Sequence, residues 1–321
     1  MKIYYLALLP LPLIAFPLLA AKGAKMKKSS PAPTALPLVT GHRGGRALGP
    51  ENTLAAARAG HAAGADRWEL DTQLTKDLVP MVLHDATLKR TTNVAKVFPK
   101  RANAPLSAFT MAEVKKLDAG SWWARRYGKK ALADGRITKE QLDYYASGKV
   151  RVPTLEEALL LTKELNWSVN VEIKVFHPGH LGPLVPKVLE TIRKTGTVDR
   201  VVISSFDHAV CYAVAHAKEP HPPVEVLTSM RLARPDLYVR DVVGAQALNP
   251  SIPCLGLGGT DETAGDPPAE LTIKRLRDAG IGINVWTVND PKIWAWCVKV
   301  GVTSIITDSP DLLRAWLNKQ R

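Results

Sequence analysis

The sequence predicts an α/β protein, a closed (β/α)8 TIM barrel with a small insertion after its third strand. Short runs rich in β-branched residues alternate with amphipathic helical stretches, which indicates a parallel sheet with helical crossovers. Eight such runs fall within about 280 residues, a usual size for this type of barrel. Gly41, Gly44 and Gly45 lack the spacing of a dinucleotide-binding loop, which disfavours an open doubly wound sheet.

Residues 1–21 are predicted to direct export, as a signal peptide or as an N-terminal membrane anchor. Lys2 precedes an apolar run over 3–21 that carries no charge and ends in small residues, which is the order of a signal peptide. The run is also long enough to span a bilayer, and the lysines that follow it oppose transfer of the downstream chain. In either form we expect a periplasmic or extracellular protein. Residues 22–37, rich in Ser and Pro, are expected to form a flexible linker before the folded domain over 38–321.

The β-branched runs and the amphipathic stretches predict the strands and helices of the folded domain one by one. The expected strands are 38–42, 67–73, 79–84, 168–174, 200–206, 224–228, 282–288 and 303–308. A ninth short run, 247–252, also has the composition of a strand. The expected helices, several of which end on glycine, are 52–64, 155–165, 184–196, 270–280 and 291–301.

Residues 85–150 interrupt the alternation of strands and helices. They hold no convincing core strand, and a long insertion in a compact domain is usually functional or disordered. We expect a helix over 106–117. Because the insertion leaves the carboxyl end of a strand, we also expect a small subdomain beside the active face of the barrel. The role of 129–145 stays open.

Charged and imidazole side chains stand at the ends of the first four predicted strands. On the second and fourth strands they lie two positions apart, so that their side chains point to the same face. Charges that point into a barrel interior are costly unless they are paired or bind a metal, which favours a functional site over a set of structural residues. In strand order they are His42 and Arg43, then Glu69 and Asp71, then His84, then Glu172 and Lys174.

The residue types in this set fit the needs of phosphodiester chemistry. Three carboxylates with no cysteine ligand suit a hard cation, Mg²⁺ or Ca²⁺. Two histidines can supply a general base and a general acid near neutral pH. One arginine and one lysine can neutralise an anionic group, and arginine can grip phosphate with two nitrogens.

The chain carries 43 Lys and Arg against 30 Asp and Glu, a formal charge of +13. Such an excess is compatible with a solvated surface, an anionic substrate or association with a membrane surface. No nucleic-acid-binding motif or basic-aromatic stripe accompanies it, so we expect no nucleic-acid partner. Three scattered cysteines are too few for a disulfide scaffold or a zinc site.

Ordered motifs along nearly the whole folded domain resemble those of the glycerophosphodiester phosphodiesterase family. The most specific cluster opens the domain: Gly41-His42-Arg43-Gly44, Pro50-Glu51-Asn52-Thr53 and Glu69-Leu70-Asp71. Later matches, in the family's order, are Val82-Leu83-His84-Asp85, Leu117-Asp118-Ala119-Gly120-Ser121-Trp122, Val152-Pro153-Thr154-Leu155, Val171-Glu172-Ile173-Lys174, Ser204-Ser205-Phe206, Val285-Trp286-Thr287-Val288-Asn289 and Thr307-Asp308.

The resemblance implies a barrel that hydrolyses glycerophosphodiesters to an alcohol and glycerol 3-phosphate with the help of one divalent cation, Ca²⁺ or Mg²⁺. For Glu51, which precedes the first predicted helix, the alternative to substrate contact is to complement the helix dipole. For Phe206 and Trp286, the alternative to substrate contact is packing in the core. The implied metal ligands are Glu69, Asp71 and Glu172, the acid–base pair is His42 and His84, the phosphate contacts are Arg43 and Lys174, and further substrate contacts are Glu51, Phe206 and Trp286.

Two other functions stay open from the sequence. A related phospholipase or sphingomyelinase of the same barrel superfamily would act on intact lipids, which the apolar N-terminus and basic charge would suit. A non-catalytic exported barrel that binds lipid is the second, although the intact histidine pair counts against it. The nucleophile, water or a neighbouring glycerol hydroxyl, is not decided by the residues.

Overall fold

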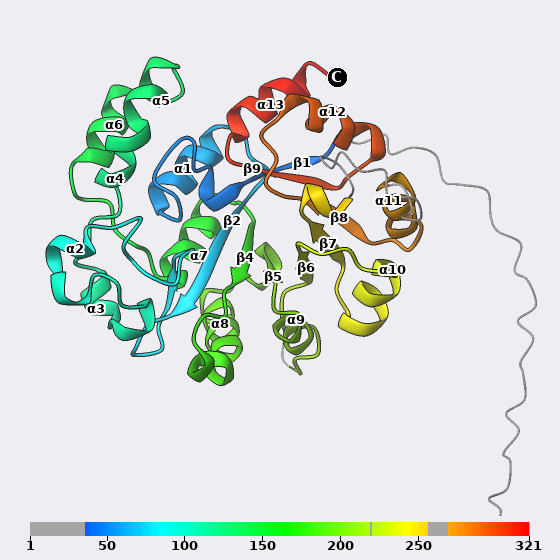
Figure 1. Ribbon diagram of the computed structural model, residues 1–321, viewed down its shortest axis with the longest axis horizontal. Coiled ribbons are helices and arrows are strands. Elements are labelled where there is room, and N and C mark those ends of the chain that lie inside the picture. The colour runs from blue at the N-terminus through cyan, green and yellow to red at the C-terminus, as the bar shows by residue number, and fades with distance from the viewer. Residues whose placement is uncertain (1–35, 219, 256–268, 321) are drawn as a thin grey trace, which may run out of the picture. The chain divides into compact units, whose positions relative to one another are not determined.

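The computed structural model describes residues 36–218, 220–255 and 269–320. Within these residues, eight parallel strands close into a barrel because β1 pairs with both β2 and β9 (Figure 1). The predicted (β/α)8 architecture is therefore confirmed. The barrel strands are β1 (Leu38–Gly41), β2 (Arg67–Leu74), β4 (Val169–Ile173), β5 (Val201–Ser205), β6 (Val224–Thr228), β7 (Ala247–Pro250), β8 (Gly282–Val285) and β9 (Ser304–Thr307).

One predicted strand is not part of the barrel. The run expected over 79–84 forms β3 (Pro80–Val82), which pairs antiparallel with the far end of β2. The chain reverses there because the Thr75 N–H donates to the Val79 carbonyl at 3.1 Å and Leu78 takes a left-handed φ of 58°. The eighth barrel strand is instead β7, the short run that counted as a possible ninth. The insertion thus follows β3, the third strand in the chain. This strand forms a hairpin with β2, which is the second strand of the barrel.

Helices cover the outside of the barrel, where the apolar side chains of the strands point. Trp68 and Leu70 on β2 and Val171 on β4 are fully buried in the layer between strands and helices. The helices that pack there are α1 (Leu54–Ala62), α7 (Leu155–Glu164), α8 (Leu181–Thr195), α9 (His208–Ala215), α10 (Pro235–Leu237), α11 (Ala269–Asp278), α12 (Pro291–Val300) and α13 (Pro310–Asn318).

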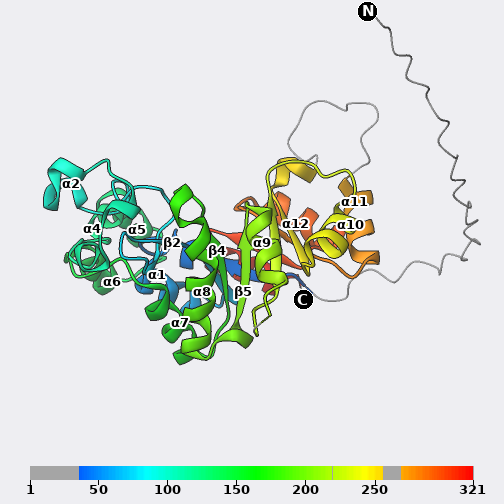
Figure 2. The same ribbon diagram turned by 90° about the horizontal axis from the view of Figure 1, so that it is seen from below.

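The insertion forms a small subdomain with its own apolar core. Figure 2 shows its helices together on one side of the barrel, beyond β2. Its buried cluster includes Phe109, Leu117 and Trp123, none of which is exposed to solvent. Its helices are α2 (Val94–Val97), α3 (Met111–Val114), α4 (Ser121–Trp123), a π-helical turn η4 (Ala124–Gly128), α5 (Lys129–Ala133) and α6 (Lys139–Ala146).

The single helix expected over 106–117 is wrong. The segment consists of a 3-10 turn, η3 (Leu106–Ala108), and the separate four-residue helix α3. The break arises at Thr110, whose hydroxyl accepts the Glu113 N–H while the Glu113 carboxylate accepts the Thr110 N–H. This capping box starts a new helix and ends the preceding turn.

No helix in the described part of the chain has the length and apolar character needed to cross a membrane. The apolar run over 3–21 and all but the last two residues of the predicted linker lie outside the described residues.

Candidate active site

A cavity of about 110 Å³ opens where the carboxyl ends of the barrel strands meet. Eight of the ten predicted site residues line it, and the other two, Asp71 and Glu51, lie directly behind its wall. Turns that follow β1, β4, β5 and β8 contribute to the lining, so residues far apart in the sequence meet at one place. This is the face of a (β/α)8 barrel on which active sites form.

Three buried carboxylates form a cluster at the floor of the cavity. Glu69 and Asp71 lie on β2, and Glu172 lies on the neighbouring strand β4 in register with Asp71. One oxygen from each lies within 4.8 Å of the others. Burial and the charge of Asp71 raise the pKa of Glu69 well above its usual range and raise that of Glu172 to about 7. Burial acts in the same direction on Asp71, but Lys174 and Arg43 lower its pKa on balance.

The cluster fits a divalent cation by its own chemistry. Within the described residues, Glu69 Oε1 has no hydrogen-bond partner although it is buried. The facing oxygens of Asp71 and Glu172 have no hydrogen-bond partner among the described residues, and they lie 3.2 and 2.5 Å from the Lys174 ammonium. Three carboxylates around one small space repel one another, and a hard cation bound by their oxygens would remove that repulsion.

Backbone geometry on the β1 side holds this cluster in place. Arg43 has a left-handed φ of 51°, and its N–H donates to Glu69 Oε2 at 2.8 Å. Asn52, also left-handed with a φ of 58°, donates from Nδ2 to Asp71 Oδ2 at 2.7 Å and accepts from the Asp71 N–H. Such conformations are uncommon outside glycine and often mark functional sites. Sequence reasoning noted Asn52 only within a motif and missed this role.

His42 is oriented by a carboxylate from a distant part of the chain. Its Nδ1 lies 2.6 Å from Oδ1 of Asp308, the residue that follows β9. Because an ionised carboxylate only accepts, Nδ1 donates and the lone pair stays on Nε2. Burial lowers the pKa of His42 despite the opposing hydrogen bond to Asp308, so the neutral ring is favoured. The role of Asp308 was missed as well, since nothing in the sequence pairs it with His42.

His84 is held by a chain of ionic contacts. Its Nδ1 lies 2.8 Å from Asp85 Oδ1, and Asp85 accepts two further hydrogen bonds from Arg90. Arg90 also binds both oxygens of Glu51 at 2.8 Å. One of these oxygens accepts from Arg43 at 2.6 Å. Glu51 therefore links the arginine beside the carboxylate cluster to the arginine that supports His84, and its oxygens are not directed into the cavity.

Two aromatic side chains form the remaining wall. Phe206 and Trp286 meet edge to face, with ring centroids 5.2 Å apart. The Trp286 indole N–H donates to the Asn249 carbonyl at 2.7 Å, which fixes the ring. Lys174 Nζ lies 5.6 Å from the centre of the Phe206 ring. Phe206 is 42% exposed, so this wall runs from the cavity to the surface.

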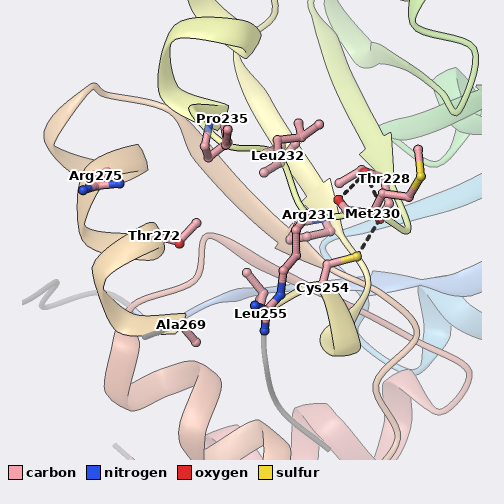
Figure 3. A pocket seen from close by; sticks show the side chains of 13 residues that line it. Thr228, Met230, Arg231, Leu232, Pro235, Cys254, Leu255, Ala269, Thr272 and Arg275 are labelled. Carbon is pink, nitrogen blue, oxygen red and sulfur yellow. Dashed lines mark hydrogen bonds between the residues drawn. The ribbon is translucent and has the colours of Figure 1, made fainter. Parts of the chain in front are cut away.

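A second, larger cavity of about 310 Å³ contains none of the predicted site residues. Figure 3 shows it between α11, which contributes Thr272 and Arg275, and the ends of β6 and β7. Cys254 lies at its edge and contacts the Thr228 carbonyl at 3.6 Å.

Comparisons with known proteins agree with this site. Residues 42–312 match the sequence model of the "Glycerophosphoryl diester phosphodiesterase family". A glycerophosphodiester phosphodiesterase of Caldanaerobacter subterraneus subsp. tengcongensis is 32% identical over 285 residues, which cover 86% of this chain and 96% of that protein. The chain belongs to the glycerophosphoryl diester phosphodiesterase family. A second member, from Bacillus altitudinis, is 32% identical over 274 residues, 84% of this chain and 94% of its own.

Solved structures share the fold of this phosphodiesterase. A phosphodiesterase of Oleispira antarctica, solved with the product sn-glycerol-3-phosphate, superposes with a TM-score of 0.70 at 21% identity and covers 88% of this chain and 97% of its own. A glycerophosphodiester phosphodiesterase of Agrobacterium tumefaciens gives 0.62 at 24% identity, with 87% and 100% covered. The family resemblance noted in the sequence is confirmed, and the protein is a phosphoric diester hydrolase.

Proposed function

We propose that this phosphodiesterase hydrolyses glycerophosphodiesters to an alcohol and glycerol 3-phosphate, with one divalent cation at the carboxylate cluster and His42 and His84 as the proton-transfer pair. One observation carries the proposal. Both histidines line the same small cavity as Glu69, Glu172, Arg43 and Lys174. A cation site, two proton-transfer groups and two fixed positive charges are what a phosphodiester transition state requires.

The carboxylates Glu69, Asp71 and Glu172 would hold the cation, Ca²⁺ or Mg²⁺. When bound there, it would offset negative charge that develops on the phosphate oxygens. Arg43 also stabilises this charge. Glu51 fixes the Arg43 guanidinium, while the buried Nε of that side chain has no hydrogen-bond partner among the described residues. That Nε faces Asp71 Oδ2 at 3.6 Å, so Arg43 acts on the phosphate through the charge of its guanidinium.

The two histidines divide the proton transfer. His42 has its Nδ1 engaged by Asp308, so its Nε2 can accept the proton of the nucleophile, water or a neighbouring glycerol hydroxyl. His84, held by Asp85 and Arg90, donates a proton to the departing alkoxide. Phe206 and Trp286 contact the carbon skeleton of the glycerol or of the leaving alcohol.

A coupled assay that detects glycerol 3-phosphate tests this function. We expect turnover across a panel of soluble glycerophosphodiesters, loss of turnover in EDTA, and its return on addition of excess Mg²⁺ or Ca²⁺. Glu172→Gln should weaken cation binding in calorimetry together with activity. Full activity after exhaustive chelation would contradict the proposal that the reaction depends on a divalent cation. Hydrolysis of intact phospholipid, with no hydrolysis of the soluble diesters, would favour the alternative of a phospholipase or sphingomyelinase.

We also propose that the enzyme acts outside the cytoplasm, next to a membrane surface from which its substrates derive. The support is the charge-free run over 3–21, preceded by Lys2. A fusion of residues 1–40 to a reporter that works only after export should be active. An inactive reporter, with the protein in the soluble cytoplasmic fraction, refutes export.

A further inference from the structure

Buried polar atoms without a hydrogen-bond partner gather at the catalytic cavity. Within the described residues, seven buried side-chain nitrogen and oxygen atoms have no such partner. Four of them belong to Arg43 and to the three carboxylates of the cluster. The other three are Nδ2 and Oδ1 of Asn170 and Oγ of Ser204, and both of these residues line the cavity. Buried polar groups are nearly always hydrogen-bonded, so these three atoms indicate a ligand that supplies the partners.

Asn170 and Ser204 stand beside the carboxylate cluster. Asn170 on β4 is in register with Glu69 on β2, and Ser204 on β5 is in register with Glu172. Because Asn170 precedes Glu172 by two residues on the same strand, both side chains point to the same face. Asn170 is 1% exposed and Ser204 is fully buried, so neither can find its partner in bulk solvent. A group that pairs with them must enter through the cavity.

Other buried polar side chains of the barrel strands are paired within the protein. Asn284 donates to Asn249 at 2.8 Å, and Asn249 donates to Glu225 at 2.8 Å. Ser205, the neighbour of Ser204, donates to a backbone carbonyl at 2.8 Å and accepts a backbone N–H at 3.1 Å. Ser205 is as deeply buried as Ser204. Burial alone therefore does not leave a serine or an asparagine of this barrel without a partner.

The chemistry of the three atoms restricts the ligand. A carboxamide presents one donor group and one acceptor, whichever way it is turned, and a serine hydroxyl can act as either. A metal cation cannot accept the Asn170 N–H, and an ionised phosphate oxygen cannot donate to the Asn170 carbonyl oxygen. A hydroxyl group can do both. The cavity of about 110 Å³ is smaller than the roughly 300–1,000 Å³ of pockets for drug-sized ligands, so it suits a small hydroxylated group.

We propose that Asn170 and Ser204 bind the hydroxyl groups of the glycerol arm and so select diesters that carry them. The inference rests on the proposed function, because it names the residues that recognise the glycerol part of that substrate. Leu227 and Ile306 line the same cavity and offer apolar contact to the carbon atoms. A site built to hydrogen-bond a hydroxyl rejects an analogue that lacks it, since buried polar groups are then left unpaired.

Calorimetric binding of the reaction product tests the inference without turnover. The full chain, saturated with Mg²⁺, is titrated with glycerol 3-phosphate and with propyl phosphate, which keeps the phosphate and three carbons but lacks both hydroxyl groups. We expect the wild type to bind glycerol 3-phosphate more tightly by about tenfold or more. Asn170→Ala and Ser204→Ala should each weaken that binding about five- to tenfold, while their affinity for propyl phosphate should not fall.

Ser205→Ala is the matched control. Its hydroxyl does not line the cavity, so this variant should keep the wild-type ratio of the two affinities. The urea midpoint of Ser205→Ala should fall, because two buried hydrogen bonds are lost. By contrast, Ser204→Ala should keep or raise the midpoint, because it removes a buried hydroxyl that has no partner in the described part of the chain. Mg²⁺ binding should be unchanged in every variant.

Four results overturn the inference. The wild type may bind neither ligand, or it may bind both equally, and in both cases the hydroxyl groups are not recognised. Variants at Asn170 and Ser204 that keep the full preference assign recognition to the cation or to other residues. Weaker Mg²⁺ binding in these variants assigns the two side chains to the cation site. Turnover of glycerophosphodiesters is measured separately, and its absence counts against the proposed function, whereas the ratio of affinities is read without it.

Discussion

Arg43 contacts several parts of the candidate active site at once. Its backbone N–H binds Glu69, its guanidinium binds Glu51, and the same peptide turn carries His42. The left-handed φ of 51° is what allows the N–H and the side chain to be used at once. Small changes at such a residue therefore move a histidine, a carboxylate and the proposed phosphate contact together.

The histidine pair gives the sharpest prediction at this scale. His42→Ala and His84→Ala should each lower kcat by about 10²–10⁴, because general acid or base assistance is worth that much. With a p-nitrophenyl leaving group, which needs little protonation, His84→Ala should recover most of its activity and His42→Ala should not. Steady-state kinetics on both substrates decide which histidine is the general acid. Cation binding measured by calorimetry is the control for folding. Recovery by His42→Ala instead would reverse the assignment.

Among the elements, α1 and the turn after β1 make an unusually close backbone contact. A Cβ built on Gly60 of α1 would lie 2.1 Å from the Gly44 carbonyl oxygen. Gly44 itself has a φ of 88° and faces the backbone of Ala57. The helix thus presses directly on η1 (His42–Gly44), the turn that carries His42 and Arg43.

Gly60→Ala should therefore damage both the fold and the site. The added methyl group must push η1 outward, which we expect to cost about 1–3 kcal/mol of unfolding free energy and to lower kcat. Gly182→Ala is the matched control, because Gly182 is also helical but no atom of the part of the chain that the structure describes lies within 4 Å of the position of a Cβ. Urea unfolding and steady-state rates measure the two effects. A Gly60→Ala protein as stable and active as the control contradicts the packing argument.

The sequence pattern predicts most of the secondary-structure elements but not which strands belong to the barrel. Seven of the eight barrel strands contain β-branched residues and are predicted as strands from the sequence, whereas β7, with the sequence Ala-Leu-Asn-Pro, contains none. The exchange of β3 for β7 could not be foreseen, because an antiparallel hairpin arm and a barrel strand have the same period and composition. The carboxylate pair on β2 was predictable from its two-residue spacing. Asn52 and Asp308 were not, since their roles depend on contacts that only closure of the barrel creates.

At the scale of the whole molecule, a buried ionic network crosses the barrel interior. Arg67 on β2 donates to Glu225 on β6 at 2.8 Å and to the Thr40 hydroxyl on β1. Asn249 on β7 donates to the same carboxylate at 2.8 Å. Four strands are thereby joined through one buried ion pair, so its loss should weaken the barrel as a unit.

Arg67→Met tests this network. The substitution leaves the Glu225 carboxylate buried without its partner, and we expect a loss of about 3–5 kcal/mol in unfolding free energy. The double variant Arg67→Met/Glu225→Leu removes both charges and should regain most of that loss. Chemical denaturation of the three proteins at neutral pH gives the comparison. If the double variant is less stable than Arg67→Met alone, the account of a buried unpaired charge is wrong.

Alkaline pH should destabilise the folded chain through its buried thiols. Burial raises the pKa of Cys211 and of Cys297 from 9.0 to about 12. The unfolded chain releases these protons near pH 9, so their contribution to stability is complete below that pH and is lost as pH rises toward 12. Each thiol should lower the unfolding free energy by about 1.4 kcal/mol per pH unit in that window. Urea unfolding at several pH values should show a shallower slope for Cys211→Ala/Cys297→Ala, and identical slopes would count against this explanation.

The hydrogen bond between His42 and Asp308 joins residues 266 positions apart. During translation, His42 and the carboxylates of β2 therefore leave the ribosome long before Asp308 is made. A nascent chain contains its proposed proton acceptor well before it contains the group that orients it. Under the proposed mechanism, full catalytic competence is reached late in synthesis, at a time set by the position of one aspartate in the reading frame, and chains that stop short of it lack an oriented base.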